Sequence, residues 1–250
     1  MNGPCAPLFD RSVKSIKLAY MRLGQTIGWR FLMGPRETLS RKTSIGIISL
    51  NPGGAGNPLG HPSESYEGGS AYMDEAWPGY AAGAAPLQRQ MQGLCTLLQQ
   101  KLGDARPLRE FMAHGIVAAY FIPFRSQNMK VLKCRQASIR FAENLWRDVL
   151  AEWNPRLIIT IDREAFKSVS KIVLERTSVG VDHIHWPSGW GDYNCETLRF
   201  SGGVTLARLP HLSRFSLFHR EASELQMSRL FDYLCDPLVS GAEGATTERR

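Results

Sequence analysis

The segment that most constrains the fold is IGIISLNPGGAG at residues 45–56, a short apolar run that ends in a turn. Its length and its β-branched residues favour a strand buried on both faces of a parallel sheet. Pro52 cannot donate a further ladder hydrogen bond, and Gly53 and Gly54 let backbone amides approach a ligand closely. Asn51 is therefore expected at the carboxyl end of a strand, where open α/β sheets place their chemistry. An ordinary strand-ending turn is the alternative interpretation.

The rest of the chain alternates between apolar runs and amphipathic segments. Further strands are predicted at 115–122, 156–161 and 204–209, and helices at 87–102, 135–150, 164–174 and 221–234. Segment 13–23 fits a helix or a strand, and segment 183–199 is typical of irregular structure. The alternation predicts an α/β fold, a three-layer αβα sandwich around a mostly parallel four-stranded sheet.

The domain organisation follows from this pattern and from local composition. We expect a basic N-terminal extension packed on the core at 1–42, one α/β domain at 43–235, and a disordered tail at 236–250. The chain has five widely spaced cysteines and no CxxC pair, which favours a reducing compartment and no zinc ribbon or cysteine-held iron–sulfur cluster. Without a signal peptide or a membrane-spanning apolar run, the sequence predicts a cytoplasmic protein that does not bind membranes.

The net charge of +7 is unevenly distributed, because the first 50 residues hold eight basic and two acidic side chains. Such a surface tolerates phosphates, although a solvated basic face without a partner is the alternative.

Four polar residues lie within three positions of the ends of the predicted strands: Asn51, Arg125, Asp162 and His211. Because the carboxyl ends of parallel strands meet at one edge of a sheet, these residues are expected to share one crevice.

Several common chemistries do not fit that crevice. The glycines after Asn51 fail the dinucleotide fingerprint in spacing, and neither a P-loop GK[ST] nor a GxSxG elbow is present. His183 and His185 would share one face of a strand and suit a metal, but no third ligand lies nearby in the sequence, so no metal site is predicted. An amide and an imidazole can orient water and stabilise a developing anion, which suits cleavage of an N-glycosidic bond.

Four segments resemble motifs of the uracil-DNA glycosylase superfamily, in that family's order. SLNPGG at 49–54 resembles its first motif, especially the G-x-N-P-G form of the mismatch-specific and single-strand-selective branches. LPHLSRFSLF at 209–218 resembles the second motif, H-P-S-P-x-S, with Leu212 where proline is usual. AAYFIPFRSQN at 118–128 and PRLIITIDREAF at 155–166 resemble the family's middle strand and its later strand–turn–helix. The matches span roughly residues 45–234.

The resemblance implies a role for each matching residue. Asn51 would position the attacking water, and His211 would donate a hydrogen bond to the carbonyl oxygen of the leaving base. The backbone of Pro52, Gly53 and Gly54 would line the base pocket.

The resemblance also implies the contacts to the flipped nucleotide. Tyr72 is the first choice to stack on the base, with Tyr66 and Tyr80 as alternatives. Tyr120 takes the place of an asparagine that reads uracil in many members, so the base pocket is expected to differ. Contacts to DNA would come from the loops after two of the strands, through Arg125, Asn128, Ser213 and Arg214.

The sequence thus predicts a monomeric, monofunctional DNA glycosylase without metal or cofactor. Its partner would be duplex or single-stranded DNA, and its substrate uracil or another modified pyrimidine, including a bulky modified base of foreign DNA. A catalytically silent binder of modified DNA and a nucleoside or nucleotide hydrolase are the alternatives.

Overall fold

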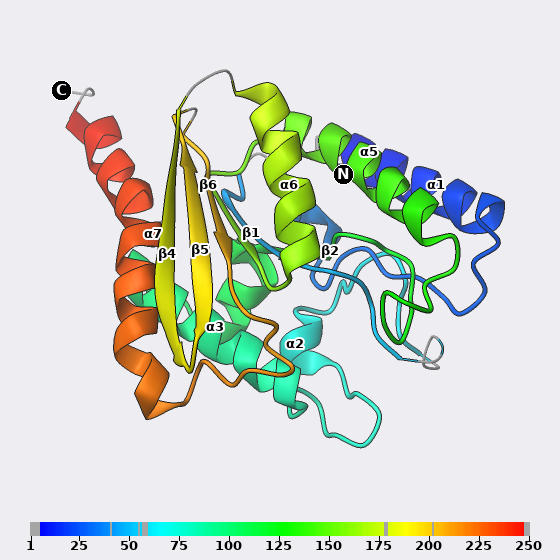
Figure 1. Ribbon diagram of the computed structural model, residues 1–250, viewed down its shortest axis with the longest axis horizontal. Coiled ribbons are helices and arrows are strands. Elements are labelled where there is room, and N and C mark those ends of the chain that lie inside the picture. Colours follow the sequence, from blue (N-terminus) through cyan, green and yellow to red (C-terminus); the bar gives the residue numbers. More distant parts are fainter. Residues whose placement is uncertain are drawn as a thin grey trace.

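The protein has an α/β fold around one mixed β-sheet, as a computed structural model shows (Figure 1). The structure describes residues 6–40, 42–54, 56, 60–177, 180–201 and 203–247, without the side chains of residues 6 and 240–247. Within these residues the sheet has six strands in the order β2-β1-β3-β6-β5-β4. In chain order they are β1 (Ile45–Ser49), β2 (Val117–Tyr120), β3 (Leu157–Thr160), β4 (Val181–Trp190), β5 (Tyr193–Phe200) and β6 (Thr205–Arg208).

The four strands predicted from apolar runs are β1, β2, β3 and β6, and they are mutually parallel. Their side chains are buried on both faces, which explains why the sequence shows unbroken apolar runs rather than alternation. Along β1, for example, Ile47 faces one core and Ile48 faces the other. All four carboxyl ends therefore lie at the same edge of the sheet.

The prediction of a four-stranded sheet is wrong, because β4 and β5 extend it by an antiparallel hairpin. The sequence analysis interpreted 183–199 as irregular, because the segment is rich in tryptophan and glycine. The structure accommodates Pro187 on the outermost strand, where the register shifts between Pro187 and Trp190. An edge strand tolerates a proline because one side of it needs no ladder donor.

Helices cover both faces of the sheet (Figure 1). One core lies between the sheet and α1 (Ala6–Arg22), α5 (Arg135–Trp153) and α6 (Arg163–Arg176). The second core lies between the opposite face and α3 (Pro86–Leu102) and α7 (Glu221–Thr247). Short helical segments complete the order: η1 (Arg36–Thr38), α2 (Ala71–Asp74), α4 (Leu108–Glu110) and η2 (Phe111–Gly115).

The four predicted helices begin within one residue of their expected starts, and all but α7 (Glu221–Thr247) end within three residues of their expected ends. Gly103 ends α3 in the left-handed conformation, with φ of 65°, which a residue without a Cβ adopts readily. Segment 13–23 falls almost entirely in α1, so the helix interpretation is the correct one. α7 passes its expected end at Leu234 and continues to Thr247. Disorder of the tail stays a prediction, and residues 248–250 lie outside the described part.

One glycine of β1 is required by close packing. A Cβ built on Gly46 would lie 2.3 Å from the indole Cη2 of Trp153, the last residue of α5. That indole is buried and donates a hydrogen bond of 2.6 Å from Nε1 to the carbonyl of Thr43. Gly46 therefore lets α5 approach the centre of the sheet.

The N-terminal region also supplies backbone beside the sheet. Residues 29–33 run antiparallel to the β2 edge, with bridges from Trp29 to Phe124 and from Leu32 to Ala119. Hydrogen bonds of 2.8 Å from Met33 N to Ala118 O and 3.0 Å from Tyr120 N to Phe31 O hold it there. This path carries Arg30 to the carboxyl edge of the sheet.

Candidate functional site

A cavity of about 1000 Å³ opens at the carboxyl ends of the parallel strands. Its walls include Asn51 after β1, Arg125 after β2, Asp162 after β3 and His211 after β6. These are the four positions that the sequence placed at strand ends, and the predicted convergence on one crevice is confirmed.

Most of the predicted site residues reach this cavity. Besides Asn51, Arg125 and His211, the lining includes Gly53, Gly54, Tyr120, Ser213 and Arg214. Pro52 is buried behind the turn and does not line it. Asn128 is exposed outside it, where its Oδ1 accepts hydrogen bonds from the backbone nitrogens of Lys130 and Val131.

Tyr72 is not placed to stack on a base. It lies on α2 with 1% of its surface exposed, and its hydroxyl is 3.3 Å from Ser49 Oγ. Burial raises the pKa of this hydroxyl well above its usual range. Two other aromatic residues between β1 and α3, Trp77 and Tyr80, line the cavity instead.

The side chain of Asn51 is fixed by hydrogen bonds from its nitrogen. Nδ2 donates to Ser126 Oγ at 2.9 Å and to the carbonyl oxygens of Pro52 and Ser126 at 3.0 and 3.3 Å. Ser126 is itself buried and donates its backbone N–H to Pro52 O at 3.0 Å. While these contacts hold, the amide can act on a water only through Oδ1, as an acceptor.

The ring of His211 is oriented by the residue two positions later. The backbone N–H of Ser213 donates to Nδ1 at 3.3 Å, and Ser213 Oγ lies 2.8 Å from the same atom. A neutral imidazole that accepts at Nδ1 carries its proton on Nε2. The ring can therefore donate a hydrogen bond from Nε2.

The surroundings of His211 favour the neutral form of its ring. Burial lowers its pKa from the usual 6.5 and Arg214 lowers it further, while the negative charge of Asp162 opposes the change without cancelling it. Asp162 is held as the N-cap of α6, where Oδ1 accepts from the backbone nitrogens of Glu164 and Ala165 at 2.6 and 3.4 Å. The cavity thus holds an imidazole whose neutral form is favoured, together with a fixed carboxylate.

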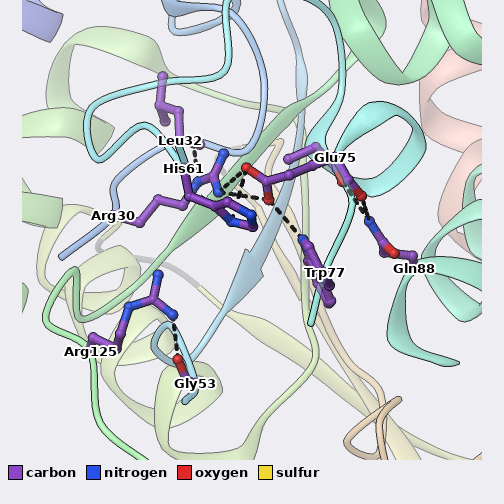
Figure 2. A network of polar contacts seen from close by, with 9 residues as sticks. Arg30, Leu32, Gly53, His61, Glu75, Trp77, Gln88 and Arg125 are labelled. Carbon is purple, nitrogen blue, oxygen red and sulfur yellow. Dashed lines mark hydrogen bonds and ion pairs between the residues drawn. The ribbon is translucent and has the colours of Figure 1, made fainter. Parts of the chain in front are cut away.

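A buried ion pair forms another wall of the cavity (Figure 2). Arg30 Nη1 contacts both oxygens of Glu75, at 2.7 and 2.9 Å, and the two side chains are only 3% and 6% exposed. Trp77 Nε1 donates to the same carboxylate at 2.7 Å, and His61 Nδ1 lies 3.3 Å from it. Among the described residues, Nη2 of Arg30 has no hydrogen-bond partner although it is buried. A ligand acceptor that entered the cavity could satisfy it.

Arg125 lies in the cavity wall rather than on an outer surface. It is 8% exposed, and Nη1 donates a hydrogen bond to the carbonyl of Gly53 (Figure 2). This hydrogen bond holds the turn after β1 in place. The guanidinium thus contributes positive charge to the wall of the cavity.

The sequence analysis did not identify Arg30, His61, Glu75 or Trp77 as site residues. The segment at 51–85 is long and rich in glycine and aromatic residues, and this was a usable signal for Trp77, because long loops inside compact domains commonly carry function. Nothing local marks Arg30 and Glu75 as partners, since 45 residues separate them.

No protein-family model matches the chain, and a search of curated proteins finds no match. Within the described residues, no helix has the length and apolar character needed to cross a bilayer.

Proposed function

We propose that this protein is a monofunctional DNA glycosylase that resembles the uracil-DNA glycosylase superfamily. The observation that carries the proposal is the presence of Asn51 and His211 in the wall of one cavity, with His211 oriented to donate from Nε2. A three-layer sandwich, the architecture expected of that superfamily, agrees with the helices on both faces of the sheet.

The proposed reaction is hydrolysis of the N-glycosidic bond of a nucleotide flipped out of DNA. The bond between C1′ and the base nitrogen breaks, and the base keeps the electron pair. Nε2–H of His211 stabilises the resulting anion through the carbonyl oxygen of the base. The water held by Oδ1 of Asn51 adds its oxygen to C1′, and its released proton balances the charge of the departing base.

Asp162 stabilises the positive charge that develops on the sugar. The sugar becomes cationic as the base departs, and a carboxylate fixed at the cavity wall stabilises positive charge. No lysine lines the described cavity, so the proposal contains no Schiff-base step.

The cavity favours a base larger than an unmodified pyrimidine. Its volume lies at the upper end of the range of about 300–1000 Å³ for small-molecule sites. Trp77 and Tyr80 offer ring faces for stacking. We therefore propose a modified pyrimidine, including bulky forms, as the substrate class.

The test is release of bases from oligonucleotides that carry uracil or larger modified pyrimidines, in single and double strands, with mass spectrometry of the products. A free modified base and an abasic site are expected. Cleavage of free nucleosides with no action on DNA would instead identify a nucleoside hydrolase. DNA binding without release of any base would identify a silent binder.

A further inference from the structure

A cluster of metal-ligating side chains lies on the β4–β5 hairpin, outside the cavity. His183 and His185 share one face of β4, and Glu196 on β5 is the direct cross-strand partner of His185. One ligand atom from each of the three residues lies within 4.8 Å of the other two. The third ligand that the sequence lacks beside the histidines is thus supplied across the hairpin.

The spacing of the ligand atoms is close to that of a metal site. His183 Nε2 and Glu196 Oε2 are 3.5 Å apart, and the two imidazole centroids are 4.6 Å apart. Nitrogen and oxygen ligands at about 2.0–2.2 Å from a tetrahedral zinc ion lie about 3.3–3.6 Å from each other. The distance between His183 Nε2 and Glu196 Oε2 therefore already matches the spacing of two ligands around zinc. Because both imidazoles are exposed, their rings can rotate to bring the remaining ligand atoms to the same spacing.

Arg208 orients the carboxylate for this role. Its Nε and Nη2 donate to Oε1 of Glu196 at 2.8 and 2.5 Å, from the neighbouring strand β6. The other oxygen, Oε2, is the one that faces His183. A hydrogen-bonded partner that fixes a ligand carboxylate is a regular feature of metal sites.

We propose that His183, His185 and Glu196 bind one Zn²⁺ ion on the β4–β5 hairpin. Two imidazole nitrogens and one carboxylate oxygen form a donor set that suits zinc, with a fourth position open to water. The side chain of His183 is 45% exposed, so the ion can enter directly from solvent. Because the ligands come from two strands, the ion would link the outermost strand to its neighbour. It stabilises the folded chain by binding the folded state in preference to the unfolded one.

The experiment uses the untagged full-length chain, stripped of metal with a chelator and dialysed against zinc chloride at several concentrations. One zinc per chain and an increase in Tm are expected. His183→Ala and His185→Ala should each weaken zinc binding by about tenfold or more and remove the increase in Tm. Glu196→Gln keeps the shape of the side chain and should weaken binding as well.

Two matched controls identify the ligands. His114→Ala removes an exposed histidine that faces Glu37 elsewhere, and Cys134→Ser removes an exposed thiol. Both variants should bind zinc as the wild type does, and cobalt in place of zinc should give no sulfur-to-metal charge-transfer band. Circular dichroism of each variant checks that the fold is retained. A wild-type chain that does not bind one equivalent overturns the proposal, as does unchanged affinity in the two histidine variants.

Discussion

Replacing Glu75 by glutamine tests how far the cavity wall depends on its buried ion pair. The carboxylate meets Arg30 at 2.7 and 2.9 Å, and both side chains are almost fully withdrawn from water. Glutamine keeps the shape but removes the negative charge, so the guanidinium is left buried without compensation. Breaking a buried pair in this way costs about 3–5 kcal/mol of folding free energy.

Urea unfolding followed by tryptophan fluorescence measures that loss. Glu67→Gln is the matched control, because Glu67 forms an exposed pair with Arg36 at 3.2 Å and its side chain is 48% exposed. Removing that charge should cost no more than about 1 kcal/mol. Arg30→Met combined with Glu75→Gln should recover part of the loss, since no unpaired charge then remains buried. A loss below about 1 kcal/mol for Glu75→Gln alone, or full additivity in the double variant, would refute the reasoning.

Three further predictions concern packing, protonation and base contact. Gly46→Ala places a methyl group against the buried indole of Trp153 and should lower the free energy of unfolding by about 1–3 kcal/mol; an unchanged urea midpoint would contradict this. Because the neutral ring of His211 is the donor and its pKa is lowered, kcat/KM for base release should fall only as the pH drops through a value below 6.5. The contribution of His211 to the free energy of unfolding should also decline as the pH falls from about 6.5, because the unfolded chain takes up the proton more readily. A kcat/KM that rises as the pH falls would be inconsistent with a neutral donor. Trp77→Ala should weaken substrate binding by about 1–3 kcal/mol, measured as a higher KM, while Trp77→Phe keeps a stacking ring and should lose less; equal losses would argue that only the indole N–H to Glu75 matters.

The strands of the parallel sheet could be predicted because their residues are buried on both faces and form unbroken apolar runs. Ile45–Ser49 and Leu157–Thr160 are the clearest cases. The convergence of Asn51 and His211 followed from strand direction alone, since the ends of parallel strands meet at one edge. The hairpin could not be predicted in this way, because β4 lies at the sheet edge and is mostly exposed or half-buried.

Contacts between distant segments are what the sequence could not indicate. Arg30 pairs with Glu75 because residues 29–33 pass beside β2, and no local pattern encodes that path. Tyr72 and Trp77 are aromatic residues of the same segment between β1 and α3, and residue type alone does not show which of them can stack on a base. Only the fold separates them, since it buries Tyr72 beneath β1 and leaves Trp77 at the cavity.

The most direct test of the central claim is the rate of base release from a modified oligonucleotide by Asn51→Ala and His211→Ala. Each variant should be slower than the wild type by about 10²–10³-fold, while both stay folded. Asn144→Ala and His114→Ala, which remove an exposed amide and an exposed imidazole outside the cavity, are the matched controls and should keep the wild-type rate. Wild-type rates in both cavity variants would show that the chemistry lies elsewhere and would contradict the account.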